Sequence, residues 1–208
     1  MSQIIGVYGA AGCGRGIMPL VRAQYPSASH VFIDDAPHAS RLNGHTVLSW
    51  RDFLSNDAEL KLVSIAVAAP HVRKKIAERC AEAKISLAEA RASTVVEMDD
   101  VILDEGACLS PYVTLTSNIR IGRCFHANLY SYVEHDAIIG NFVTLAPGAK
   151  VNGNVTIGDY VYIGSGAVIR QGLTIGPGST IGMGAVVTRD VPAGITVVGN
   201  PARPLIKE

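Results

Sequence analysis

Residues 157–187 read IGDYVYIGSGAVIRQGLTIGPGSTIGMGAVV, in which isoleucine followed by glycine recurs at positions 157, 163, 175 and 181. The same pair stands at positions 121 and 139, so every interval is a multiple of six. The frame set by these pairs is apolar throughout, at Leu103, Leu109, Leu115, Ile121, Ala127, Val133, Ile139, Leu145, Val151, Ile157, Ile163, Ile169, Ile175, Ile181 and Val187. Two residues before each of these positions stands a mostly small or aliphatic side chain.

A six-residue period of apolar side chains favours short strands over an α-helix. An amphipathic α-helix needs an apolar residue about every 3.6 positions, whereas short strands joined by tight glycine turns can repeat every six. Such strands stack into a parallel β-helix, in which each coil buries the inward side chains of its neighbour and supplies its backbone hydrogen bonds. With three six-residue sides in each coil, residues 103–187 predict about five coils.

Composition excludes several classes of function. Eighteen Lys and Arg balance eighteen Asp and Glu, so there is no basic field to attract nucleic acid or anionic lipid. The N-terminus has neither a signal peptide nor a transmembrane pattern, so we expect a cytoplasmic protein without membrane insertion. The four cysteines lie far apart with no CxxC motif, which favours reduced thiols and no metal site.

The N-terminal third has the pattern of a small parallel sheet. Strands are predicted at residues 4–8, 30–33 and 62–68, and helices at 17–24 and 71–83. A GxxGxG turn at residues 9–14 follows the first strand, and Asp34 and Asp35 follow the second. Such a turn lets the backbone approach a phosphate, and such acids bind ribose hydroxyls or a base edge, although tight turn chemistry alone would also explain the glycines. We expect a Rossmann-like α/β domain over residues 1–85 and the β-helix over 86–208.

The whole chain resembles a known family. The hexapeptide units, closed by VVTRDVPA at 186–193 and VGNPAR at 198–203, resemble those of the hexapeptide-repeat acyltransferases. With the GxxGxG turn and FIDD at 32–35, the chain is similar to nucleotide-sugar acetyltransferases of the bacillosamine and perosamine type, relatives of the sialic acid O-acetyltransferases. This resemblance implies a left-handed β-helix and a homotrimer with acetyl-CoA in the groove between neighbouring β-helices.

The resemblance also implies site residues. It places the nucleotide of the acceptor beside Ala11, Gly12, Cys13, Asp34 and Asp35, with Ala68 at the end of the third strand and Asn128 near the sugar's amino group. It places acetyl-CoA along Thr144, Ser165 and Met183, with the Gly153 amide binding the developing oxyanion. Arg203 is a candidate for contact with the CoA phosphates.

Histidine is the side chain best suited to accept the proton of an attacking amine near neutral pH. The repeat holds two histidines, and the second, His135, is followed directly by Asp136. The family motif has its catalytic histidine at the matching place, which makes His135 the general base and Asp136 its orienting partner. The alternative is a solvated surface histidine. We expect His126 to have a structural or substrate-side role. Since no G-x-S-x-G motif occurs, we expect direct transfer without an acetyl-enzyme.

The sequence therefore predicts an acetyl-CoA-dependent N-acetyltransferase. Our first expectation for the acceptor is UDP-4-amino-4,6-dideoxy-N-acetylglucosamine, a precursor for glycan biosynthesis. GDP-perosamine and, for O-acetylation, sialic acid are the alternatives. A β-helix scaffold or a sugar-nucleotide-binding module is the non-enzymatic alternative. A zinc enzyme of the β-helix carbonic anhydrase type would need three histidine ligands, whereas the repeat holds two. An NAD-dependent oxidoreductase would need an unbroken dinucleotide fingerprint, which the GxxGxG turn does not provide.

Overall fold

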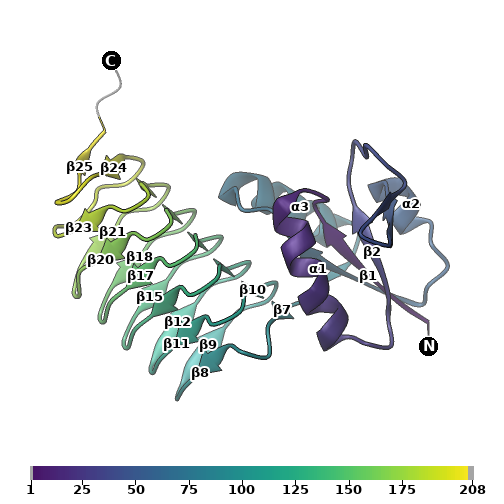
Figure 1. Cartoon of the computed structure of the whole chain (residues 1–208), viewed down its shortest axis with the longest axis horizontal. Coiled ribbons are helices and arrows are strands. Elements are labelled where there is room, and N and C mark those ends of the chain that lie inside the picture. The colour runs from purple at the N-terminus through teal and green to yellow at the C-terminus, as the bar shows by residue number, and fades with distance from the viewer. Residues whose placement is uncertain (1, 206–208) are drawn as a thin grey trace.

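The computed structural model describes residues 2–205, which form an N-terminal α/β lobe followed by a β-helix (Figure 1). The lobe contains one six-stranded sheet in the order β3-β4-β2-β1-β5-β6. Its strands pair in parallel, apart from the antiparallel β3–β4 hairpin. The elements of the lobe are β1 (Gln3–Tyr8), α1 (Gly12–Gln24), β2 (Ser29–Ile33), β3 (Arg41–Leu42), β4 (His45–Leu48), α2 (Trp50–Leu54), β5 (Leu60–Ile65), α3 (Pro70–Glu82) and β6 (Ser86–Leu87).

Successive side chains of β1 point to opposite faces of the sheet, and helices cover both faces. Ile5 and Val7 pack in one core cluster with the buried face of α1, whereas Ile4 and Tyr8 pack in another with residues of α2 and α3. The predicted strands and helices are all present, with shifted bounds. The largest shift is in α1, which begins at Gly12 where the sequence predicted a turn, because the second half of the glycine motif forms its first helical turn.

The β-helix has three faces, and the strands of each face pair in parallel except for the last strand of face 1. Face 1 consists of β7 (Ala90–Arg91), β10 (Cys108–Leu109), β13 (His126–Ala127), β16 (Thr144–Leu145), β19 (Tyr162–Ile163), β22 (Thr180–Ile181), β24 (Thr196–Val198) and the antiparallel β25 (Arg203–Pro204). Face 2 consists of β8 (Val96–Glu97), β11 (Thr114–Leu115), β14 (Tyr132–Val133), β17 (Lys150–Val151), β20 (Val168–Ile169) and β23 (Val186–Val187). Face 3 consists of β9 (Val101–Leu103), β12 (Ile119–Ile121), β15 (Ile138–Ile139), β18 (Thr156–Ile157) and β21 (Thr174–Ile175).

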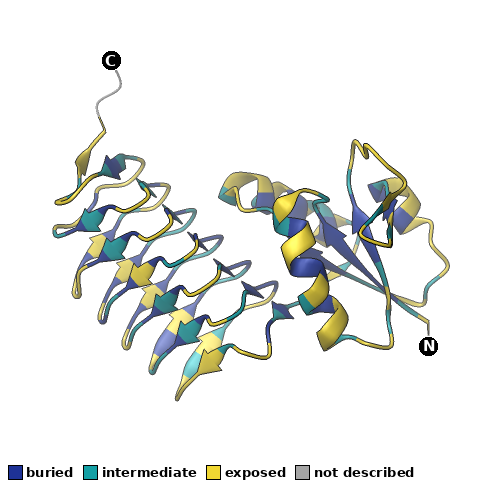
Figure 2. Ribbon diagram, viewed as in Figure 1, coloured by how far each residue is buried: buried dark blue, intermediate teal, exposed yellow. Residues whose placement is uncertain are grey.

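The register confirms the predicted period. Each strand pairs with the strand one coil on, as in His126↔Thr144 and Thr144↔Tyr162. Every residue of the apolar frame is buried except Leu103, which is half-buried, and together they form one continuous core (Figure 2). Burying these rows against each other is the main stabilising contribution to the solenoid.

The β-helix extends further toward the N-terminus than the apolar frame. Its coils begin at β7, before position 103, where the frame continues with the charged residues Arg91 and Glu97. The guanidinium of Arg91 donates to Glu97 at 2.6 Å and also contacts Glu89. These ion pairs lie in the first coil, where no preceding coil exists to bury apolar side chains, so hydrophobic periodicity alone missed that coil.

The two parts meet along face 1. The chain passes from β6, the last strand of the N-terminal sheet, to β7, the first strand of the β-helix, at residues 88–89. Ala88, Ala90 and Cys108 share a core cluster with α1, so the lobe and the first coils are packed together. None of the helices within residues 2–205 has the length and apolar character needed to cross a bilayer.

Candidate active site

The predicted catalytic pair lies in the turn between β14 and β15. Asp136 has a left-handed backbone with a φ of 58°, a region that aspartate and asparagine adopt more readily than most residues. His135 Nδ1 lies 2.8 Å from Asp136 Oδ2. Asn118, one coil earlier, donates its Nδ2 to the other carboxylate oxygen at 3.1 Å. Because a carboxylate only accepts, Nδ1 carries the proton of the neutral imidazole, and Nε2 keeps a free lone pair.

Hydrogen bonding keeps Asp136 ionised. The bond with His135, and then the bond from Asn118, lower the pKa of the Asp136 carboxyl below its ordinary value. A carboxylate beside Nδ1 is the arrangement that orients a general-base histidine in acid–base catalysis. The side chains of His135 and Asp136 are 55% and 47% exposed, so the pair lies at the surface of the single chain.

The next coil of the β-helix packs against the imidazole of His135. A Cβ on Gly153 would lie 2.6 Å from both Cε1 and Nε2 of His135, so the ring occupies the space that a side chain would need. The Asn154 amide donates to the His135 carbonyl at 2.8 Å, which holds the two turns at this spacing. A side chain at position 153 would therefore force the imidazole out of its present position.

Glu134 is a site residue that the sequence analysis missed. Its Oε2 accepts a hydrogen bond from the Gly153 amide at 3.1 Å. This is the amide that the family resemblance assigns to the oxyanion, so in this structure the predicted donor is paired with a carboxylate. The only signal in the sequence was the position of Glu134 directly before His135.

A small cavity lies where the N-terminal lobe meets face 1. It has a volume of about 30 Å³ and is lined by Cys13, Ala68, Asn128 and Thr144, among others. The first three were expected at the acceptor and the fourth on the acetyl-CoA path, and the structure brings all four together. Burial raises the pKa of the Cys13 thiol, so this cysteine is a poor nucleophile near neutral pH.

Two polar side chains of face 1 hold this junction. His126 is buried, and its Nε2 lies 2.8 Å from the Ile65 carbonyl. Burial, reinforced by the charge of Arg73, lowers the pKa of His126 well below its ordinary value, so the ring is neutral and Nε2–H donates. Thr144 Oγ1 donates to the Ala68 carbonyl at 2.8 Å. Both residues contact the N-terminal lobe.

Two larger cavities lie at the carboxyl ends of β1, β2 and β5, where parallel α/β sheets bind ligands. One, of about 430 Å³, is lined by Asp34 and Asp35, and the other, of about 400 Å³, by Ala11 and Asp34. Asp34 lies between the two. Asp35 accepts from the Tyr8 hydroxyl at 2.7 Å and from Arg79 Nη1 at 2.8 Å, so its carboxylate is already held in the cavity wall.

The glycines of the turn have different roles. Gly9 has a φ of 111°, and a Cβ on Gly14 would lie 1.7 Å from the Gly9 carbonyl, so the fold needs glycine at both positions. A Cβ on Gly12 would have only the flexible Arg15 side chain nearby, at 3.9 Å, so the fold does not need glycine there. Gly12 is the first residue of α1, and the preceding Ala11 provides no side-chain cap. The helix N-terminus is therefore open to an anion.

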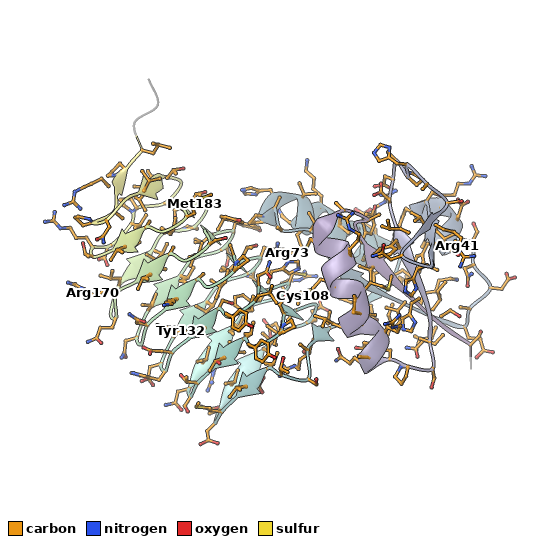
Figure 3. All side chains as sticks on the ribbon, viewed as in Figure 1. Arg41, Arg73, Cys108, Tyr132, Arg170 and Met183 are labelled. Atoms are coloured by element: carbon orange, nitrogen blue, oxygen red, sulfur yellow. The ribbon has the colours of Figure 1, made fainter. Side chains whose placement is uncertain are left out.

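The remaining predicted residues lie along two corners of the β-helix. The Asn128 corner, between faces 1 and 2, is formed by the turns 128–131, 146–149, 164–167 and 182–185. It carries Ser165 and Met183, both exposed. Figure 3 labels Met183. The His135 corner, between faces 2 and 3, is formed by the turns 134–137 and 152–155 and carries Gly153. A single chain thus places His135 on a different corner from Asn128, Ser165 and Met183.

Comparisons with known proteins show which family the chain belongs to. Residues 4–80 match the PglD N-terminal domain, and residues 136–171 and 154–189 match the bacterial transferase hexapeptide (six repeats). The chain is 44% identical over 211 residues to GDP-perosamine N-acetyltransferase from Escherichia coli O157:H7, and the alignment covers 97% of this chain and 96% of that protein. The chain belongs to the hexapeptide-repeat nucleotide-sugar acetyltransferases.

Solved structures place this acetyltransferase in the same family. WeeI from Acinetobacter baumannii AYE is 51% identical with a TM-score of 0.96, covering 98% of this chain and all of that one. The acetyltransferase domain of PglB from Neisseria gonorrhoeae FA1090, in complex with acetyl coenzyme A, is 30% identical with a TM-score of 0.90 and covers 99% of this chain and all of that one. The predicted fold, the acetyltransferase activity and the acetyl-CoA donor are confirmed.

Within residues 2–205, no group of three or more His, Cys, Asp and Glu side chains is arranged to hold a metal ion. The assignment of individual residues to the two substrates stays a prediction.

Proposed function

We propose that this acetyltransferase transfers an acetyl group to the 4-amino group of a nucleotide-linked 4-amino-4,6-dideoxy sugar. The observation that carries the proposal is the partly exposed His135 imidazole, whose Nδ1 is bonded to Asp136 and whose ring lies against Gly153. The open N-terminus of α1 and the cavities around Asp34 support a nucleotide handle on the acceptor.

The proposed reaction is a direct transfer. The neutral amine attacks the thioester carbonyl carbon, a C–N bond forms, and His135 Nε2 takes the amine proton. The tetrahedral intermediate then collapses, the C–S bond breaks, and the thiolate of CoA receives a proton from the imidazolium. No protein nucleophile is needed, and burial raises the pKa values of Cys13 and of Cys108, the latter to about 12.

Glu134 occupies the Gly153 amide, which is the proposed oxyanion donor. The Gly153 amide can bind the thioester oxygen only after it is released from Glu134 Oε2, with which it is paired at 3.1 Å. We therefore propose that acetyl-CoA displaces the Glu134 carboxylate when it enters the groove beside His135.

A homotrimer would bring the His135 corner of one chain next to the Asn128 corner of another. Three chains around one axis can bring the His135 corner of one β-helix against the Asn128 corner of its neighbour, forming a groove lined by Gly153 on one side and by Ser165 and Met183 on the other. Met183 is 82% exposed in the single chain, which is unusual for a large apolar side chain and supports contact with another molecule.

Two acceptors are to be compared, UDP-4-amino-4,6-dideoxy-N-acetylglucosamine and GDP-perosamine. The 44% identity to a GDP-perosamine N-acetyltransferase supports the second. Release of the CoA thiol should be measured with each sugar, with the matching non-aminated nucleotide sugar as the control. Turnover only with an amino sugar is expected. Turnover with sialic acid instead would favour O-acetylation, and thermal protection by neither acetyl-CoA nor a sugar nucleotide would favour a scaffold.

A further inference from the structure

Arg73, in α3, is fully buried yet belongs to the N-terminal lobe. Figure 3 places it where the lobe meets the β-helix, close to Cys108. Its five N–H groups lie within hydrogen-bond distance of six acceptors, so one N–H of Nη2 is shared between two of them; the acceptors are the carbonyls of Val67 (2.8 Å), Ala68 (3.0 Å), Cys124 (2.8 Å), Phe142 (2.7 Å) and Val143 (3.1 Å) and the Thr144 hydroxyl (3.0 Å). Two of these acceptors lie in the lobe and four in the β-helix.

The acceptors in the lobe are part of the candidate substrate site. Val67 lines the cavity of about 430 Å³ beside Asp34 and Asp35, and Ala68 lines the junction cavity. Helix α3 itself contributes Lys75 and Arg79 to the larger cavity. On the β-helix side, Thr144 lines the junction cavity. One side chain therefore connects the walls of both cavities to the coils.

A buried cation at this point is not needed for packing alone. Among the partners of Arg73 in the described part of the chain there are only carbonyls and one hydroxyl, with no carboxylate to neutralise it. Burial lowers the pKa of Arg73 to about 10, so it stays charged at neutral pH. Burying a charge is costly, and an apolar side chain of similar volume often stabilises a protein as well or better. What an apolar residue cannot supply is a planar fork of five donors that fixes direction.

We propose that Arg73 is a positioning residue. It fixes the lobe cavity of about 430 Å³, which we assign to the nucleotide sugar, relative to the Asn128 corner of the β-helix, where the acceptor's amine is expected. This inference rests on the proposed function. It predicts that Arg73 affects turnover without contacting either substrate.

The test compares Arg73→Lys with wild type in the full-length protein. Lysine keeps the charge but has three donors on one atom, so it cannot reach both sets of carbonyls. We expect kcat with the amino sugar nucleotide to fall about 10- to 100-fold, since small misalignments have effects of this size. The KM for acetyl-CoA and the Kd for UDP or GDP, measured by calorimetry, should stay within threefold, because each of these ligands needs only one part of the molecule.

A second readout reports on the junction without any turnover. The Cys108 Sγ is buried there and lies 3.7 Å from the Ile65 carbonyl. Alkylation of Cys108 by iodoacetamide, followed by mass spectrometry, should be faster in Arg73→Lys than in wild type at a temperature well below both melting points. Arg22→Lys, an exposed arginine of α1, is the matched control and should change neither readout.

The outcomes separate this inference from the proposed function. If Arg73→Lys folds and its kcat is within threefold of wild type, or if nucleotide affinity falls as much as kcat, the positioning role is overturned. If Arg73→Lys does not fold, Thr144→Val removes one acceptor of Arg73 and the bond to Ala68, and it should lower kcat at least twofold with faster Cys108 alkylation; unchanged kcat overturns the inference. If wild type acetylates no amino sugar nucleotide, the proposed function fails, and the alkylation rates still decide whether Arg73 holds the junction.

Discussion

The imidazole of His135 lies against Gly153 so closely that a methyl group on residue 153 would stand 2.6 Å from Nε2. We expect Gly153→Ala to push the ring away from its position beside the thioester and to lower kcat about 100-fold, since catalysis depends steeply on such placement. Steady-state kinetics with saturating acetyl-CoA and amino sugar nucleotide would measure this.

Gly16→Ala is the matched control for this substitution. Gly16 is exposed in α1, and a Cβ there would meet no atom within 4 Å beyond the adjoining helix backbone. Alanine there should leave kcat unchanged and raise the free energy of unfolding by about 0.5–1 kcal/mol, the usual gain in a helix interior. Equal kcat values for Gly153→Ala and wild type would contradict the placement of the ring.

His135→Ala should lower kcat by about 10²- to 10⁴-fold, the range expected for removing a general base. Asp136→Asn should have a smaller effect in the same direction, because it removes the negative charge beside Nδ1 while leaving an oxygen that can accept. Both changes lie on an exposed turn, so melting temperatures should stay close to that of wild type. A folded His135→Ala protein with near-normal turnover would show that another group takes the proton.

The repeating part of the fold could be predicted because each coil obeys one local rule. The apolar frame from Leu109 to Val187 is buried throughout, since stacking leaves those side chains no other place. The first coil could not be predicted in this way, because Arg91 and Glu97 occupy its frame positions and pair with each other.

The site was predictable only where its residues are neighbours in the sequence or belong to a motif. His135 and Asp136 are adjacent, so the pair was visible. Asn118 reaches Asp136 across one coil, and Arg73 binds acceptors up to 71 residues away in the chain. Backbone carbonyls carry no sequence signal, so the partners of a buried arginine cannot be read from residue types.

A side chain fits at Gly12, so a substitution there can test whether the N-terminus of α1 binds the phosphates of the nucleotide. We expect Gly12→Asp to fold normally, since an acidic residue in the first turn favours a helix. Its carboxylate would repel a diphosphate at the N-terminus of α1, so the Kd for UDP or GDP should rise at least tenfold, a change measurable by calorimetry.

Two alanine variants complete the phosphate test. Gly12→Ala should change nucleotide affinity less than Gly12→Asp, because it adds bulk without charge. Gly14→Ala should lower the melting temperature, because its Cβ would overlap the Gly9 carbonyl. Wild-type nucleotide affinity in Gly12→Asp would place the phosphates elsewhere.

His126 predicts a pH dependence of stability. Its pKa is lowered by burial in the folded state, so the unfolded chain binds a proton that the folded chain does not as the pH falls below about 6.5. Stability should therefore decrease with falling pH below that value, by at most about 1.4 kcal/mol per pH unit from this group. Urea unfolding of wild type and His126→Gln between pH 5 and 7.5 would measure the difference. Equal slopes for the two proteins would show that folding leaves the pKa of His126 unchanged.

The arrangement of His135 and Asn128 on different corners predicts that two chains share each site. If His135 of one chain serves the acceptor bound to its neighbour, two impaired variants can complement each other within one trimer. In mixed trimers of His135→Ala and Gly12→Asp chains, a site is intact when a Gly12→Asp chain supplies His135 and a His135→Ala chain supplies Gly12. Random assembly from equal amounts makes about a quarter of the sites intact, following the head-to-tail order of a cyclic trimer.

Refolding the two variants together from denaturant would measure this complementation, with each variant refolded alone as the control and light scattering to establish the trimer. At acceptor concentrations well below the wild-type KM, we expect the mixture to have near a quarter of the activity of refolded wild type, and either control to have much less. If the mixture is no more active than the average of the controls while mixed trimers have formed, His135 serves the acceptor of its own chain, because a site built within one chain would carry one defect or the other in every subunit.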